Sequence, residues 1–176
     1  MEKRLKLVLI CTLIMVALSL SAVQGTKAQA GEDKGESREN RVLKNRLKVP
    51  KEADIDKDIT LDALLTKKGS KDLSTAKAAV IEGHVIQVER EEDGDYHLTL
   101  ASKAGETDTN KWVIVEVTPA WQKRKVSLSN AQIKKLHGKK IRVEGWLFYE
   151  PDEPSNDPRG TGWELHPVTN ITVLND

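Results

Sequence analysis

The alternation of apolar and polar residues becomes regular only in the second half of the chain, from about residue 74 onward. There, runs rich in β-branched and aromatic residues are separated by short polar stretches, a pattern typical of β-strands. Interior glycines in the first and fourth runs, Gly83 and Gly145, predict a bulge or bend in those strands. The pattern predicts five strands, at residues 78–88, 96–100, 112–118, 140–149 and 163–174.

A helix is predicted between the third and fourth strands. Residues 129–132 (SNAQ) fit a capping box, in which Ser129 and the glutamine three positions later satisfy each other's backbone N–H groups. Ile133 and Leu136 supply an apolar stripe, and Gly138 is placed to end the helix. The order β-β-β-α-β-β predicts an all-β fold with one helix, the five-stranded OB-fold Greek-key barrel. An SH3-like barrel is the nearest alternative, but it leaves a capped helix at this position unexplained.

The chain begins with three basic residues followed by an apolar run at residues 7–22 and by Ala28-Gln29-Ala30. This arrangement predicts that residues 1–30 form a cleaved secretory signal peptide. The alternative is an uncleaved N-terminal anchor, because the apolar run is nearly long enough to span a bilayer. Both interpretations place residues 31–176 outside the cytoplasm, as a secreted or periplasmic protein. After cleavage, we expect no transmembrane span.

Three further segments follow the predicted signal peptide. Residues 31–57 are charged and lack aromatic residues, which predicts a disordered polar linker. Residues 58–73 carry a short helical pattern of apolar side chains and form a predicted helical appendage, and residues 74–176 form the OB-fold domain. The only cysteine, Cys11, lies in the apolar run. The exported chain therefore has no disulfide and no thiolate metal site.

The distribution of charged residues indicates which classes of ligand the predicted site can bind. The first thirty residues hold four basic side chains and one acidic side chain, which leaves 24 basic and 26 acidic residues in the remainder. Residues 89–95 and 150–162, the loops that flank the usual OB-fold ligand site, are both strongly acidic. Because acidic loops repel phosphates, nucleic acid is not expected there. A cationic or neutral ligand, such as a small molecule, glycan, peptide or metal ion, fits better, unless these are ordinary solvated loops.

Basic residues gather instead in one segment without acids, residues 123–142, which we call the basic segment. It is either a solvated helix face or a surface that docks on an anionic component of the cell envelope. The residues predicted to make that contact are Lys123, Arg124, Lys125, Lys134, Lys135, Lys139 and Lys140.

Two histidines and two glutamates form the sharpest candidate site. Antiparallel pairing of the second and third strands sets His97 opposite Glu116. Glu164 and His166 share one face of the fifth strand, which lies beside the third strand in an OB-fold. Two imidazoles and two carboxylates suit a divalent ion such as zinc. The alternative is a surface cross-strand pair together with a purely structural hydrogen-bonding group.

Four further residues are assigned to the ligand site because they lie in or beside the predicted loops. Trp121 follows a proline next to basic residues, and Trp163 opens the fifth strand. Asp95 and Arg159 belong to the first and second acidic loops. Trp112, Trp146 and Tyr96 are assigned to the core.

Four short sequence motifs resemble those of other proteins: DYHL at 95–98, EVTP at 116–119, GWLF at 145–148 and WELHPV at 163–168. Over residues 78–174 the chain resembles uncharacterised exported bacterial OB-fold proteins, which implies a fold more than an activity. No Ser-His-Asp or Cys-His arrangement is recognisable. The sequence therefore favours an exported, non-enzymatic OB-fold binding module. The alternatives are a metal-dependent hydrolase using the His/Glu residues, a nucleic-acid-binding OB protein, or an envelope adaptor docking through the basic segment.

Overall fold

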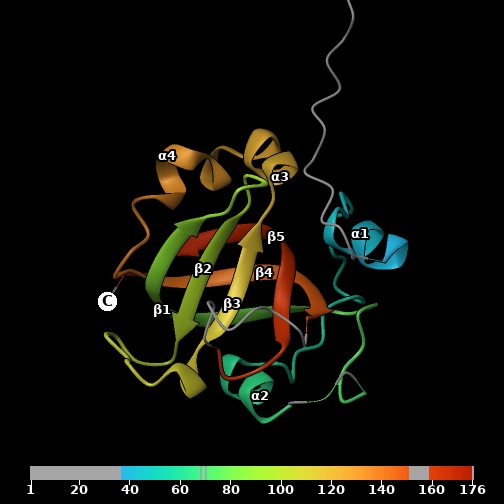
Figure 1. Ribbon diagram of the computed structural model, residues 1–176, viewed down its shortest axis with the longest axis horizontal. Helices are drawn as coiled ribbons and strands as arrows, with labels where there is room; N and C mark the ends of the chain where they lie inside the picture. Colours follow the sequence, from blue (N-terminus) through green and yellow to red (C-terminus); the bar gives the residue numbers. More distant parts are fainter. Residues whose placement is uncertain (1–36, 68, 70, 151–158, 176) are drawn as a thin grey trace, which may run out of the picture.

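The computed structural model (Figure 1) describes residues 37–67, 69, 71–150 and 159–175. The predicted signal peptide and most of the second acidic loop lie outside the described residues. Among the described residues, no helix is long and apolar enough to cross a membrane.

The five strands close into a barrel in the order β1-β2-β3-β5-β4. The β3–β5 pair is parallel and the other pairs are antiparallel. This strand order is that of the OB-fold, so the predicted fold class is confirmed. The strands are β1 (Ala78–Arg90), β2 (Tyr96–Ala101), β3 (Val113–Val117), β4 (Lys140–Tyr149) and β5 (Trp163–Val173).

Alternation along the strands decides which side chains fill the barrel. Leu98 and Leu100 of β2 and the three valines of β3 belong to the central apolar cluster. Because successive side chains of a strand point to opposite faces, His97 and Glu116 lie on the outer face. Every residue of β3 is nevertheless buried. Other parts of the protein therefore cover the outer face of β3, and the carboxylate of Glu116 is buried beneath them.

The connection from β3 to β4 differs from the single helix that was predicted. It contains α3 (Pro119–Arg124), the 3-10 turn η2 (Val126–Leu128) and α4 (Asn130–Ile133). Ser129 is the N-cap of α4, but its side chain makes no capping hydrogen bond, so the predicted capping box is wrong. Each short element buries one large side chain, Trp121, Leu128 or Ile133. Three separate anchors, and not one continuous stripe, therefore hold this connection against the barrel.

The two interior glycines have different roles. At Gly145 the β4–β5 register shifts on both sides, which confirms the predicted bulge. In β1, the irregularity lies between Val85 and Gln87, beyond Gly83. A Cβ at Gly83 would lie 2.8 Å from Cδ1 of Leu61. Gly83 therefore makes room for α2 (Leu61–Thr66), whose apolar face closes the end of the barrel opposite α3 and α4 (Figure 1).

Residues 37–57 do not match the predicted disordered linker. They begin with α1 (Arg38–Lys44) and continue along the barrel (Figure 1). The Trp121 indole N–H donates to the carbonyl of Arg46 at 2.9 Å, and the Trp146 indole N–H donates to that of Lys48 at 2.8 Å. A buried indole needs an acceptor, and this polar segment supplies two carbonyl groups. The boundaries of the predicted domains stay predictions.

Candidate functional site: a buried carboxylate–histidine cluster

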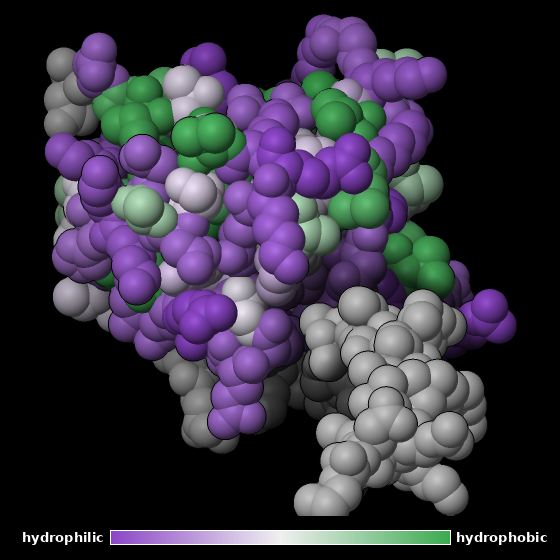
Figure 2. Space-filling model, turned by 90° about the horizontal axis from the view of Figure 1, so that it is seen from above, coloured by the Kyte–Doolittle hydropathy of each residue, from purple (hydrophilic) through white to green (hydrophobic). Residues whose placement is uncertain are grey.

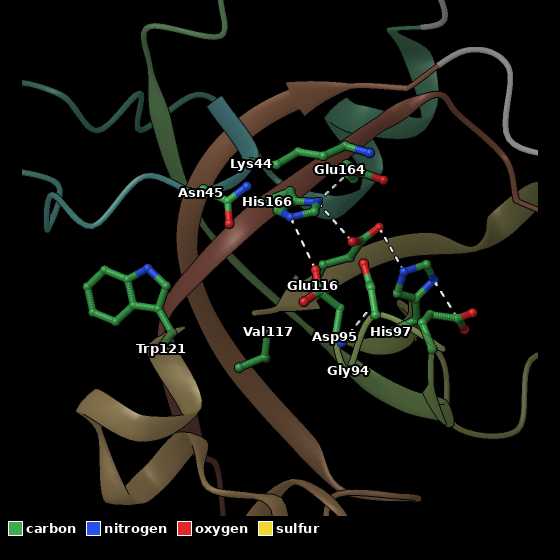
Figure 3. Close-up of polar contacts among 12 residues, drawn as sticks. Lys44, Asn45, Gly94, Asp95, His97, Glu116, Val117, Trp121, Glu164 and His166 are labelled. Atoms are coloured by element: carbon green, nitrogen blue, oxygen red, sulfur yellow. Dashed lines mark hydrogen bonds and ion pairs between the residues drawn. The ribbon is translucent and has the colours of Figure 1, made fainter. Parts of the chain in front are cut away.

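Strand pairing brings the predicted histidines and glutamates together. The β2–β3 register pairs His97 with Glu116, as the sequence predicts. The parallel contact between Val115 and Leu165 then sets Glu116 of β3 beside the outward-facing residues of β5. Asp95, at the end of the turn before β2, completes the group. We call Asp95, His97, Glu116, Glu164 and His166 the carboxylate–histidine cluster (Figure 3).

His166 lies at the centre of this cluster (Figure 3). Its Nδ1 lies 2.8 Å from Oε2 of Glu116 and 3.2 Å from Oε1 of Glu164. Its Nε2 lies 3.6 Å from Oδ2 of Asp95. Nε2 is buried and makes no hydrogen bond with any described residue. On the other side of Glu116, Oε1 lies 3.2 Å from Nε2 of His97.

The cluster is almost closed to solvent. Glu164 is 0 % exposed, His166 2 % and Glu116 4 %. Phe148 covers His166 edge-on, with ring centroids 5.8 Å apart. Placing three carboxylates out of water is costly unless cations or hydrogen bonds compensate. The cluster therefore differs from an ordinary apolar interface, because it buries several charged groups that must be compensated.

Arg159 supplies one compensating charge. Its Nη1 lies 2.7 Å from Oε2 of Glu164, and its Nη2 donates to the carbonyl of Glu150 at 2.6 Å. The guanidinium therefore ties the connection before β5 to the cluster. The sequence assigned Arg159 to the ligand site, and the structure places it behind Glu164, where it positions that carboxylate.

His166 is the second compensating cation, because neighbouring carboxylates raise its pKa. Burial alone would lower the pKa of His166, but the charge of Glu116 and hydrogen bonds to Glu116 and Glu164 raise it to about 10. Burial opposes ionisation of Glu116 as well, yet His166 and His97 hold its pKa well below the usual value. The Glu116–His166 contact is therefore an ion pair at neutral pH.

The other two carboxyl groups shift in the opposite direction. Burial, and secondarily the charge of Glu116, raises the pKa of Glu164. Burial raises the pKa of Asp95 to about 6, although His166 counteracts it. Both groups therefore ionise less readily than they would in water, and a further cation would favour their charged forms.

Three members of the cluster can hold a metal ion. Asp95, Glu116 and His166 each offer one ligand atom, and these atoms lie within 4.8 Å of one another. The sequence proposed a different set of ligands: His97, Glu116, Glu164 and His166. His97 and Glu164 instead contact the ligands from behind, through Glu116 and through Nδ1 of His166.

Asp95 is the candidate metal-binding residue that sequence reasoning missed, although it was assigned to the ligand site. Gly94 has φ +95°, and the amide of Asp95 donates to Oδ1 of Asp93 at 3.0 Å. This tight turn directs Asp95 towards β5. The signal in the sequence is the Asp-Gly-Asp turn directly before a histidine-bearing strand.

Two predicted ligand contacts are wrong. Trp121 is 1 % exposed, and Trp163 is 0 % exposed, with its indole N–H donating to the carbonyl of Gly69. Both belong to the core, because a large aromatic ring gains more from burial than a loop position predicts. Tyr96, Trp112 and Trp146 are buried, as the sequence predicts.

Residues of the basic segment lie outside the cluster, on the connection from β3 to β4 and at the start of β4. Lys125 is half-buried, with Nζ 3.4 Å from Oδ1 of Asn170. Lys140, at the start of β4, is also half-buried. The exposed residues among those predicted to contact an anionic surface are Lys123, Arg124, Lys134, Lys135 and Lys139.

No family model matches this chain, and no curated protein does. Similar solved structures include Entamoeba histolytica asparaginyl-tRNA synthetase, at 14 % identity over 61 % of this chain and 22 % of that one, with a TM-score of 0.41. A putative aspartyl-tRNA synthetase from Leishmania major Friedlin is 13 % identical over 75 % of this chain and 23 % of that one, with a TM-score of 0.44.

The S. pombe Stn1-ten1 complex is also similar, at 18 % identity over 56 % of this chain and 59 % of that one, with a TM-score of 0.37. This chain spans less than two thirds of the length of each of these three proteins. The fold assignment therefore rests on the strand order of the barrel itself. The resemblance to exported bacterial proteins stays a prediction.

Proposed function

We propose that this protein is an exported, non-enzymatic OB-fold binding module that takes a divalent metal ion at Asp95, Glu116 and His166. The observation that carries the proposal is the buried Nε2 of His166, which has no hydrogen bond and faces the carboxylate of Asp95. A buried polar atom without a hydrogen bond is costly in a folded protein. A metal ion bound between the imidazole and the two carboxylates would remove that cost.

The surrounding residues have the arrangement expected around a metal-binding histidine. Glu164 contacts Nδ1, the ring nitrogen opposite the one that faces Asp95, and Arg159 holds Glu164 in place. A carboxylate on the second ring nitrogen fixes the orientation of a ligating imidazole and raises its basicity. One nitrogen and two oxygen ligands suit zinc and related first-row ions.

Metal binding at this site requires the loss of a proton. A ligating imidazole must be neutral, whereas His166 carries a positive charge because of its carboxylate neighbours. In the metal-free protein, the imidazolium acts as the local cation. The incoming ion replaces that charge, so we expect affinity to rise steeply with pH.

The same geometry disfavours the alternatives at this site. Nucleic-acid binding on an OB-fold uses cations and exposed aromatic rings. The cluster instead presents three carboxylates, and no aromatic side chain is exposed in the described part of the chain. A metal-dependent hydrolase needs a coordination position that substrate can reach. The burial of all three ligands favours binding over hydrolysis.

The test is titration of the purified protein, after treatment with EDTA, with Zn²⁺, Mn²⁺ and Ca²⁺ by isothermal calorimetry. We expect one equivalent of a first-row ion to bind, with proton release. Asp95→Asn and His166→Gln should abolish this binding. His137→Gln removes an exposed histidine and serves as the control for adventitious zinc. Absence of binding, or unchanged binding in both cluster variants, would refute the proposal.

A further inference from the structure

An apolar groove lies at the end of the barrel that carries α4, and none of its lining residues belongs to the cluster. It encloses about 510 Å³, and its lining includes Leu136 and Ile171, which are nearly buried. Val126 on η2 and Val173 at the end of β5 also line it and are 83 % and 48 % exposed. Figure 2 views the molecule from this end and shows apolar patches set among hydrophilic side chains.

The margin of the groove is cationic. Lys135 and Lys139 line it directly, and Lys134 is the exposed neighbour of Lys135. Among the described residues, none of these three lysines forms an ion pair, whereas Arg142, farther along the segment, pairs with Glu82. Residues 123–142 contain no acidic side chain. Several unneutralised cations and an apolar hollow therefore share one surface.

Exposed apolar side chains beside lysines are a combination suited to a membrane interface. Val126 projects from a short turn directly after Lys123, Arg124 and Lys125. Apolar side chains at an interface enter the acyl boundary while neighbouring cations contact anionic headgroups. A nucleic acid would need exposed aromatic platforms, and the tryptophan of this region, Trp121, is 1 % exposed.

We propose that this end of the barrel docks on an anionic phospholipid surface. Lys134, Lys135 and Lys139 contact the headgroups, and Val126 enters the interface beside the groove. The proposal does not depend on metal binding, because no residue of the carboxylate–histidine cluster lines the groove.

The test is co-sedimentation of the purified protein with vesicles of phosphatidylglycerol and phosphatidylcholine, with pure phosphatidylcholine as the comparison. EDTA is present throughout, so failure of the metal proposal leaves the result unaffected. We expect binding only to the anionic vesicles, weakened by added salt. Lys134→Gln, Lys135→Gln and Lys139→Gln should each weaken binding roughly fivefold, and the triple variant roughly 100-fold.

Matched control variants distinguish docking through the groove from a general attraction between the protein's positive charges and the anionic vesicles. The triple variant Lys51→Gln, Lys71→Gln and Lys103→Gln removes three exposed lysines outside the groove and should keep most of the binding. Val126→Ser should weaken binding roughly tenfold, since it removes apolar burial. Val42→Ser, at another exposed valine, should not. Circular dichroism checks that every variant is folded.

Three outcomes would overturn the proposal. The first is no binding to anionic vesicles at low salt. The second is an equal loss in the groove triple variant and the control triple variant, which would show only net-charge attraction. The third is lysine-dependent binding to polyglutamate or single-stranded DNA with none to vesicles, which would assign the surface to an acidic protein or a nucleic acid.

Discussion

Oδ2 of Asp95 lies 3.6 Å from Nε2 of His166, and both groups are buried. Asp95 ends the turn between the first two strands, whereas His166 lies on the last strand. Closure of the barrel brings them together beside Glu116. This contact joins a carboxyl group whose pKa is raised to an imidazole whose pKa is also raised, so a metal ion bound between them would have to displace the imidazole proton.

Replacing Asp95 should increase the stability of the metal-free protein and abolish metal binding. In the folded protein, burial raises the pKa of Asp95 to about 6 from an ordinary value of 3.8, so its ionisation above that pH opposes folding. Asp95→Asn mimics the neutral form. We expect the metal-free variant to be more stable at pH 8 by on the order of 2 kcal/mol, and to gain nothing from added metal. Urea unfolding with and without Zn²⁺ measures both effects. A metal-free variant less stable than the parent would contradict this account.

Stability of the metal-free protein should decrease in alkaline solution. The pKa of His166 is raised from 6.5 to about 10, so the folded state holds its proton more tightly than the unfolded state does. The contribution is fully present below pH 6.5 and is lost as pH rises towards 10. Urea unfolding in EDTA at pH 7, 8.5 and 10 should show the decrease. His166→Gln should have a flatter profile, and an identical slope in this variant would argue against an imidazolium in the cluster.

Two arginine–glutamate pairs should differ strongly in their value to the fold. Arg159 and Glu164 form a buried pair, whereas Arg142 and Glu82 form a pair that is about half exposed. Arg159→Met leaves Glu164 buried without its guanidinium and should cost about 3–5 kcal/mol of stability. Arg142→Met should cost less than about 1 kcal/mol. Chemical denaturation of both variants tests the contrast, and equal losses would show that Arg159 is not a buried partner.

The N-terminal segment, residues 37–57, should be held less firmly when the Trp121 indole N–H that binds it is removed. Trp121→Phe deletes the hydrogen bond to the carbonyl of Arg46 while keeping an aromatic ring in the core. We expect a loss of about 1 kcal/mol in stability and faster proteolysis within residues 37–57. Trp112→Phe is the control, because its indole N–H donates to Glu106 in the loop before β3. Similar cleavage rates in the two variants would show that the Trp121 hydrogen bond does not hold the segment.

The barrel was predictable because it depends on local regularities. Alternation in residues 96–100 and 112–118 gives the correct β2–β3 register, which sets His97 against Glu116. The helices between β3 and β4 were not predictable in detail. A capping-box motif predicts one helix, but the chain forms three short helical elements because Trp121, Leu128 and Ile133 each occupy a separate place in the core.

The sequence by itself determined the succession of strands along the chain, the absence of a cysteine-based site in residues 31–176, and the pairing of one histidine with one glutamate. Each of these depends on side-chain type and on period-two alternation, which are local properties. Only the tertiary structure decided that Asp95, and not His97, places a potential metal-binding atom close to those of Glu116 and His166. It also decided that the polar N-terminal segment packs on the barrel and that Trp121 and Trp163 are core residues. These outcomes depend on barrel closure and on which buried donors find acceptors, and both are set by contacts between residues far apart in the chain.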